Sequence, residues 1–110
     1  MGTIRKPEEF QGKARQVLEP LYEVIDPELF INIVDMGLIY DIEVDGEKNI
    51  FITMTLSTRF CPMGEAITGG ILRVLQRTFP EYEVHIDVTF DPPWSLDRLT
   101  PEGKKMLAVG

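Results

Sequence analysis

The chain has 110 residues, 44% of them hydrophobic and 26% charged, which fits one globular domain over residues 1–110. Eighteen acidic against eleven basic residues give a net charge of −7, and no run of Lys and Arg is longer than a pair. This composition excludes a basic groove for nucleic acid, and apolar runs this short exclude a membrane span.

The first predicted element is a helix between about residues 10 and 25. Apolar residues recur there at spacings of three and four, as on one face of an amphipathic helix that includes Ile25. Pro20 interrupts the pattern, so the helix either kinks there or gives way to a second short helix that begins at Pro20. The sequence "DPE" at 26–28 ends the helical stretch, because a residue before proline prefers extended backbone.

Two strands joined by a turn follow, at 38–44 and 50–57. Each alternates apolar and polar residues with period two, and the Asp45-Gly46 pair between them is typical of a turn. The two segments are therefore predicted to form an antiparallel hairpin. The apolar face of the first strand consists of Leu38, Tyr40, Ile42 and Val44.

Helical spacing returns at 62–79, alternation returns at 84–90, and Thr100 and Pro101 begin a last helix as N-cap and first helical residue. The element order is therefore α-β-β-α-β-α. All three strands are half apolar and half polar, so we expect one sheet with helices on one face. The strand–helix–strand crossover makes the last two strands parallel. The predicted fold class is α+β, a two-layer domain with a small mixed sheet.

The single cysteine, Cys61, lies between the second strand and the long helix, directly before Pro62. As the predicted N-cap of that helix, its sulfur would face unpaired backbone N–H groups and the positive end of the helix dipole. Both features favour a thiolate, to which the hydroxyls of Ser57 and Thr58 can donate hydrogen bonds. The alternative, that Cys61 is only a small half-buried apolar residue, stays open. With one thiol no intrachain disulfide can form, so we expect a reducing, cytoplasmic location.

Two acidic residues and one tryptophan complete the candidate site. Asp26 in "DPE" and Asp35 before Gly37 offer carboxylate oxygens beside a thiolate, although each is also a typical turn-capping residue. Trp94 follows two prolines, and it either pins the C-terminal tail onto the core or presents its ring to a partner. His85, the only histidine, is expected at the surface of the third strand without a nucleophile beside it. We therefore do not expect an enzyme.

Four segments, "VIDPEL", "IVDMGLIYDIEV", "STRFCPM" and "DPPWSLDRLTPEGK", follow one another between about residues 17 and 107. In order and spacing they resemble the SufT/PaaD-like family, also called domain of unknown function 59. That family includes a subunit of the eukaryotic cytosolic iron–sulfur targeting complex. The family's two aspartates match Asp26 and Asp35, and its reactive cysteine matches Cys61.

The resemblance implies a small α/β assembly-domain fold and a role in maturing iron–sulfur proteins. Its members assemble clusters or deliver them to client apoproteins, so the implied partners are iron–sulfur assembly proteins and those clients. The phenylacetate-degradation branch assists an oxygenase system, which implies that one enzyme complex could be the client. The family usually has two threonines before the cysteine, and this chain has Ser57, which keeps the hydroxyl, and Thr58.

One cysteine limits how a cluster can be held. An iron–sulfur cluster usually takes four cysteine thiolates, and one chain supplies one. A cluster held through Cys61 would therefore be transient and shared: within a homodimer, with small thiols, with oxygen ligands, or with the client. Our hypothesis is that Cys61 is a labile ligand while the Trp94 segment or the polar face of the sheet docks a partner. The alternatives are a metal-free adaptor, which would not depend on Cys61, and a thiol enzyme.

Overall fold

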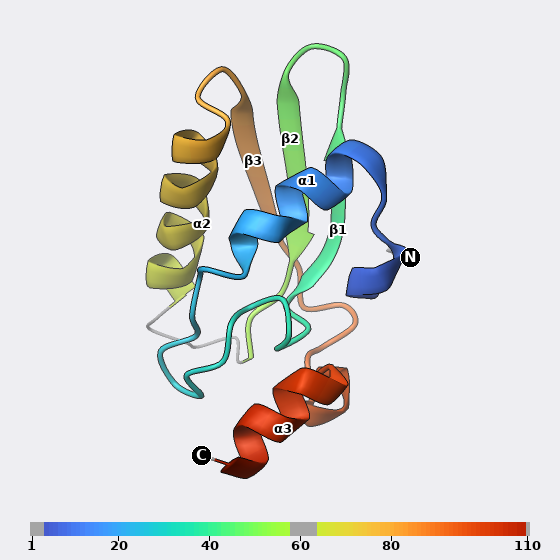
Figure 1. Cartoon of the computed structure of the whole chain (residues 1–110), viewed down its shortest axis with the longest axis vertical. Coiled ribbons are helices and arrows are strands. Elements are labelled where there is room, and N and C mark those ends of the chain that lie inside the picture. Colours follow the sequence, from blue (N-terminus) through green and yellow to red (C-terminus); the bar gives the residue numbers. More distant parts are fainter. Residues whose placement is uncertain (1–3, 58–63, 110) are drawn as a thin grey trace.

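The structure, a computed structural model, describes residues 4–57 and 64–109. Its two single 3-10 turns are η1 (Pro7–Glu9) and η2 (Leu96–Arg98). Its helices and strands follow the predicted α-β-β-α-β-α order of an α+β fold (Figure 1). No helix within the described ranges is long and apolar enough to cross a membrane. The elements are α1 (Gly12–Leu21), β1 (Ile39–Val44), β2 (Asn49–Met54), α2 (Gly64–Thr78), β3 (Glu83–Val88) and α3 (Pro101–Val109).

The three strands form one mixed sheet in the order β1-β2-β3. β1 pairs antiparallel with β2, and β2 pairs parallel with β3, the strand that follows α2. Asp45 holds the β1–β2 turn, because its Oδ1 accepts hydrogen bonds from the backbone N–H groups of Glu47 and Asn49, both at 2.9 Å. The prediction of a hairpin followed by a parallel strand is confirmed.

The alternation predicted for β1 is wrong at the start of the strand, because a β-bulge lies between Ile39 and Asp41. Ile39 pairs with Met54 and belongs to the hydrophobic core, while Tyr40 is the extra residue of the bulge and is not part of the core cluster. Tyr40 is nevertheless buried, at 2% exposure, and its hydroxyl donates a hydrogen bond to the carbonyl of Pro92 (2.7 Å). One inserted residue shifts the period-two pattern, which is why the alternation misassigned Tyr40.

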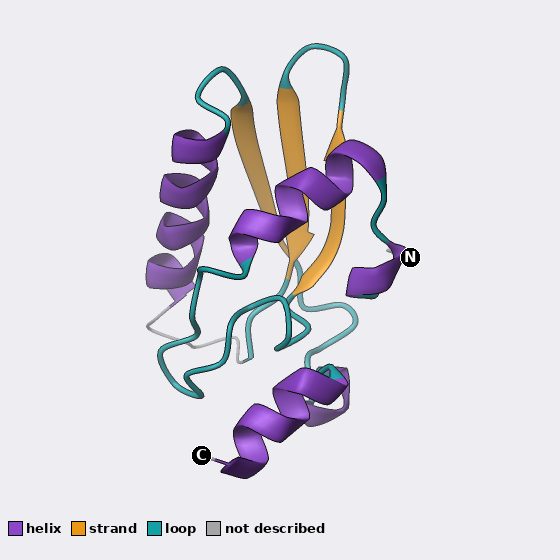
Figure 2. Ribbon diagram, viewed as in Figure 1, coloured by secondary structure: helices purple, strands orange, loops and turns teal. Residues whose placement is uncertain are grey.

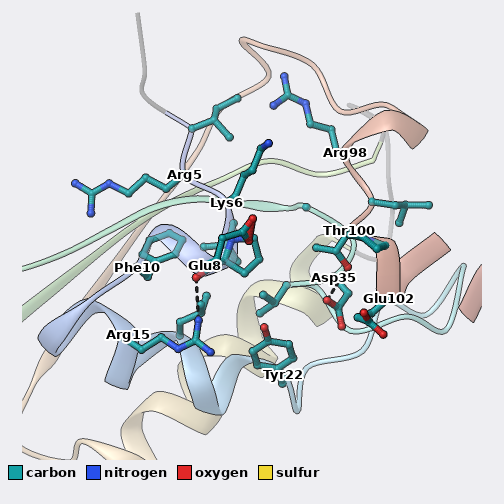
Figure 3. A pocket seen from close by; sticks show the side chains of 18 of the residues that line it. Arg5, Lys6, Glu8, Phe10, Arg15, Tyr22, Asp35, Arg98, Thr100 and Glu102 are labelled. Carbon is teal, nitrogen blue, oxygen red and sulfur yellow. Dashed lines mark hydrogen bonds between the residues drawn. The ribbon is translucent and has the colours of Figure 1, made fainter. Parts of the chain in front are cut away.

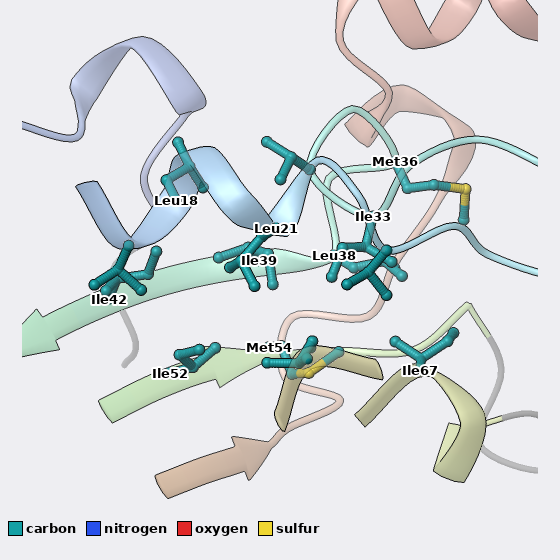
Figure 4. Packing of buried hydrophobic residues seen from close by; sticks show 14 of the residues in the cluster. Leu18, Leu21, Ile33, Met36, Leu38, Ile39, Ile42, Ile52, Met54 and Ile67 are labelled. Carbon is teal, nitrogen blue, oxygen red and sulfur yellow. The ribbon is translucent and has the colours of Figure 1, made fainter. Parts of the chain in front are cut away.

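The hydrophobic core lies between one face of the sheet and two helices (Figures 2 and 4). α1 packs against β1, α2 packs against β3, and the two helices contact each other. The predicted placement of helices on one face therefore holds for α1 and α2. The most buried residues of these elements include Leu18, Leu21, Ile42, Ile50, Ile52, Ile67, Ile71 and Leu75.

α1 is shorter than predicted. It is one helix that ends at Leu21 with Pro20 inside its last turn, so no second helix begins at Pro20. Ile25, predicted on the buried face of the helix, lies beyond it in an isolated bridge with Asn32 and is 49% exposed. A proline removes a backbone donor, and the helix stops one residue after it.

α3 lies beyond the end of the sheet at which β2 and β3 finish, below the strands in Figure 1. It packs against the loop 22–38, which joins α1 to β1, rather than on the face of the sheet. The backbone N–H of Thr100 donates to the carbonyl of Asp35 in that loop (2.9 Å). The loop that holds both candidate aspartates therefore contacts the start of α3 through Asp35.

Candidate functional site

The predicted reactive segment is described only at its two flanks. Cys61 and Thr58 fall within residues 58–63, outside the described residues. Ser57, directly before this segment, is half-buried beyond the end of β2, and Gly64, directly after it, is buried at the start of α2. The described part of the candidate site is therefore the loop 22–38 and its neighbours.

Asp26 caps a tight turn in this loop. Its Oδ1 accepts hydrogen bonds from the backbone N–H groups of Glu28 (2.8 Å) and Leu29 (3.0 Å). Its backbone N–H donates to the carbonyl of Ile31 (2.9 Å), and its carbonyl accepts from the N–H of Phe30 (2.8 Å). These bonds close residues 26–31 into a small loop around the aspartate.

The second carboxylate oxygen of Asp26 has no partner among residues 4–57 and 64–109. The residue is 1% exposed, and its Oδ2 is buried with no hydrogen-bond partner in the described parts of the chain. An unpaired buried carboxylate oxygen is unfavourable, and such groups are rare in native proteins. This oxygen can accept a hydrogen bond or bind a cation. That Asp26 supplies a ligand stays a prediction.

Asp35 has partners on both oxygens. Its Oδ2 accepts a hydrogen bond from Nδ2 of Asn32 (2.7 Å), and its Oδ1 accepts one from the hydroxyl of Thr100 (2.7 Å). The backbone N–H of Asp35 donates in turn to Oδ1 of Asn32 (2.8 Å). Asp35 is 7% exposed, so these bonds are largely shielded from water. The carboxylate ties the loop to α3, which gives it a structural role.

Thr100 connects this network to α3. Its hydroxyl accepts a hydrogen bond from the N–H of Gly103 (3.0 Å), which confirms Thr100 as the N-cap. Gly103 allows the close approach of helix and loop, because a Cβ at this position would lie 2.6 Å from the carbonyl oxygen of Asp35. The sequence "TPEG" signals the cap, but nothing in it signals a partner 65 residues earlier in the chain.

The two aspartates lie in one loop but in separate hydrogen-bond networks. No described residue bonds to both carboxylates, although the N–H of Ile33 donates to the carbonyl of Val24 (2.9 Å) and so joins the two halves of the loop. Residues 4–57 and 64–109 hold no group of three or more His, Cys, Asp or Glu side chains that could bind a metal ion. That Asp26 and Asp35 flank the thiol stays a prediction.

Trp94 packs half-buried against the core. Its Nε1 donates a hydrogen bond to the carbonyl of Met36 (2.6 Å), in the loop that also holds Asp35. These contacts are those of a residue that pins the C-terminal segment to the loop, the first of its two predicted roles. A partner-binding role for the exposed part of the ring stays a prediction.

Sequence reasoning missed an exposed aromatic residue in the Asp26 turn. Phe30 is 77% exposed and has φ 58°, a left-handed conformation that is uncommon for a bulky residue. The exposed Ile25 lies directly before Asp26. The "DPELF" sequence signals a turn, but the exposure of its phenylalanine depends on tertiary packing.

A pocket of about 780 Å³ lies beside Asp35, between the N-terminal segment, α1 and the start of α3 (Figure 3). Tyr22 borders it. Burial, followed by the negative charge of Asp35, raises the pKa of the Tyr22 hydroxyl above its ordinary value of 10.0. Basic and acidic side chains line the pocket in equal number, so its charge indicates no ligand class. They are Arg5, Lys6, Arg15 and Arg98, and Glu8, Asp35, Asp97 and Glu102.

A family model described as "Iron-sulfur cluster assembly protein" matches residues 14–88, from α1 to the end of β3. The chain belongs to this family. The matched range contains both aspartates and Cys61, and it confirms the resemblance inferred from the four sequence segments. Trp94 lies outside it.

Individual members of the family align along most of their length. The chain is 37% identical over 86 residues to the "Fe-S protein maturation auxiliary factor SufT" of Staphylococcus aureus, covering 78% of this chain and 98% of that protein. It is 30% identical over 93 residues to the "Fe-S protein maturation auxiliary factor YitW" of Bacillus subtilis, covering 84% and 91%. The crystal structure of a DUF59 domain from Bacillus anthracis matches with a TM-score of 0.85 at 37% identity, covering 88% and 92%. The fold of this chain is therefore that of the family.

Proposed function

We propose that this protein is an auxiliary factor in the maturation of iron–sulfur proteins, which helps to assemble clusters or to deliver them to client apoproteins. The observation that carries the proposal is the family match over residues 14–88, a range that contains Cys61. In support, two relatives aligned along most of their length are named maturation auxiliary factors. The cluster is cargo in this proposal.

Cys61 is the proposed labile ligand of the cargo. A cluster usually takes four thiolates and this chain supplies one, so the remaining ligands come from a second protomer, small thiols or the client. A ligand set that the client completes favours transfer over storage. Ser57 and Thr58 offer hydroxyls that can donate hydrogen bonds to the thiolate.

Asp26 is the described side chain best suited to assist the thiol. Its buried Oδ2 lacks a partner among the described residues. It can therefore accept a hydrogen bond or bind a cation while the cluster is transferred. Both oxygens of Asp35 accept hydrogen bonds from within the chain. We therefore assign Asp26 to the chemistry of the site and Asp35 to its stability.

The proposed role is accessory rather than catalytic, in the cytoplasm, with assembly proteins and clients as partners. A thiol enzyme needs a base beside its nucleophile, whereas the ring of His85 is stacked on Phe51, with 4.9 Å between centroids. A metal-free adaptor, for example for a single oxygenase complex, is the second candidate. The exposed Phe30 favours it, because an apolar contact with a client requires no thiol.

A complementation experiment tests the proposal. Cells that lack the gene receive the wild-type protein or Cys61→Ser at matched levels, and aconitase is assayed beside malate dehydrogenase, which holds no cluster. We expect aconitase activity with Cys61→Ser to stay at the level of the deletion strain, and malate dehydrogenase activity to stay unchanged.

The control variant is Ser95→Ala, an equally small change at an exposed residue whose side chain makes no capping hydrogen bond. It should restore aconitase as the wild type does. Equal rescue by Cys61→Ser would replace the cluster-ligand role with the adaptor role. A deletion strain with undiminished activity in every iron–sulfur enzyme assayed would contradict the maturation role itself.

A further inference from the structure

The face of the sheet that points away from α1 and α2 carries an exposed aromatic pair. Ile50 and Ile52 of β2 belong to the core, so Phe51 between them points to the opposite face. Phe51 is 41% exposed, and its ring stacks on that of His85 in β3 with centroids 4.9 Å apart and planes at 16°. His85 is held in turn by Asn49, whose Oδ1 lies 3.1 Å from its Nε2. Both residues are exposed, and we call this stacked pair the platform.

Acidic side chains surround this platform. The strand register places Glu43 of β1 beside Phe51, and Phe51 beside His85, in one row across the sheet. In the next row, Asp41 and Asp87 flank a threonine of β2. Together these residues form what we call the open-face patch: Asp41, Glu43, Phe51, Glu83, His85 and Asp87.

Within the described ranges, little positive charge offsets these acids. Arg5 forms an ion pair with Asp41, with 3.1 Å between Nε and Oδ1. In the described parts of the chain, Glu43, Glu83 and Asp87 form no ion pair. The patch therefore retains a surplus of negative charge around its aromatic centre.

The spacing of the acids excludes a single metal ion as the counter-charge. Neighbouring strands lie about 4.8 Å apart, and alternate residues of one strand lie about 7 Å apart. The acids are accordingly spread over three strands, and the described residues contain no group of three that could hold a metal ion. Separate carboxylates around an aromatic platform match an extended ligand with several positive charges.

We propose that the open-face patch docks a basic segment of a partner protein. An arginine of that segment stacks on the Phe51–His85 platform, and flanking Lys or Arg side chains pair with Glu43, Glu83 and Asp87. A guanidinium group both stacks on aromatic rings and pairs with carboxylates, so one residue type satisfies both features of the patch. An aromatic centre within a polar rim is typical of protein interfaces. This inference goes beyond the proposed function, since it uses neither Cys61 nor Asp26.

Titration of a hexa-arginine peptide into the ¹⁵N-labelled protein at low salt tests the proposal. We expect the largest changes in amide chemical shift on β1, β2 and β3 at the residues of the open-face patch. Phe51→Ala should weaken binding roughly tenfold, the effect of losing about 1.4 kcal/mol of stacking. Glu43→Gln and Asp87→Asn should each weaken it several-fold, and salt should weaken it further.

Two exposed acids outside the patch serve as matched controls. Glu65→Gln on α2 and Glu102→Gln on α3 remove the same charge and should leave the affinity unchanged. Equal weakening by Glu65→Gln and Glu43→Gln would show attraction to the net charge alone and would overturn the proposal. Unchanged affinity of Phe51→Ala would overturn it as well. Shifts on the patch that appear with rising protein concentration in the absence of peptide would make a second copy the occupant, again overturning it.

Discussion

Asp26 and Asp35 lie nine positions apart in one loop, and both are buried. They differ in how many of their carboxylate oxygens accept hydrogen bonds from the described residues. Each oxygen of Asp35 accepts one hydrogen bond, Oδ2 from Asn32 in the same loop and Oδ1 from Thr100 at the start of α3. Asp26 uses one oxygen for its own turn and leaves the other without a partner among the described residues. The two aspartates thus differ in whether the described residues supply a hydrogen-bond donor to both carboxylate oxygens.

This difference separates stability from function within the candidate site. A carboxylate with all its hydrogen bonds made inside the chain contributes to folding, and removing it leaves buried donors unsatisfied. A carboxylate with an unpaired buried oxygen lowers stability, a cost that is retained where the group serves a ligand. Substitution of Asp35 should therefore lower mainly the stability of the fold, and substitution of Asp26 should lower mainly the activity.

The largest expected effect is that of Asp35→Ala. The change removes two short hydrogen bonds to a buried charge and leaves the Asn32 amide unpaired, so we expect the free energy of unfolding to fall by about 3 kcal/mol. Urea unfolding measures it. Asp97→Ala, at an exposed aspartate, should change it by less than about 0.5 kcal/mol. A loss below about 1 kcal/mol for Asp35→Ala would refute the structural role.

Gly103→Ala tests the same contact from the side of α3. Its Cβ would lie 2.6 Å from the carbonyl oxygen of Asp35, which forces the helix away from the loop. We expect a loss of about 2 kcal/mol despite the better helix propensity of alanine. Gly69→Ala in α2 is the matched control, because its Cβ would meet only the end of the Arg73 side chain, at 3.5 Å. It should stabilise the protein by about 0.5–1 kcal/mol, and a similar gain for Gly103→Ala would contradict the close contact.

The fold was predictable because its signals are local. Strand alternation, the turn at Asp45 and the cap at Thr100 each depend on residues within a few positions of one another, and all three are present in the structure. The bulge at Tyr40 was not predictable, because one inserted residue leaves the composition of the strand unchanged. The end of α1 was misjudged because an apolar residue, Ile25, continued the helical spacing beyond the helix.

The candidate site was predictable only as a set of residue types. Sequence reasoning and the family resemblance pointed to Asp26 and Asp35 together, since both lie in turns and both are acidic. Their difference depends on Thr100, which donates to one of them from a position far along the chain. Spacing within a loop carries no information about such a partner. The sequence likewise gives no sign that Oδ2 of Asp26 lacks a partner among the described residues.

Asp26→Asn should change stability little but lower activity, whereas Asp35→Ala should mainly lower stability. The amide keeps an oxygen for the N–H groups of Glu28 and Leu29 and removes a buried charge, so we expect unfolding free energy to change by less than about 1 kcal/mol. In the complementation assay, aconitase activity should nevertheless fall several-fold, because the proposed ligand oxygen is lost. A stability loss as large as that of Asp35→Ala would assign Asp26 to folding, and full rescue would remove it from the proposed site.

The smallest effect is expected at Asp45, an exposed aspartate that caps the β1–β2 turn. Its oxygens accept hydrogen bonds from the N–H groups of Glu47 and Asn49 and from the Asn49 side chain (3.0 Å). The backbone bond from Asn49 is the main cause that lowers the pKa of Asp45 below its ordinary value of 3.8. The folded state therefore binds fewer protons than the unfolded state, and this stabilisation is present above pH 3.8 and lost as the pH falls further.

Asp45→Asn keeps an acceptor for the turn but cannot take up a proton. At pH 7 its urea midpoint should stay close to that of the wild type, while on acidification through the region below 3.8 it should lose less stability than the wild type. Equal losses would show that the turn bonds do not distinguish the two protonation states. Asp45 and Asp26 both cap turns through backbone N–H groups, so a small effect at the exposed residue would attribute the distinct behaviour of Asp26 to burial rather than to its turn.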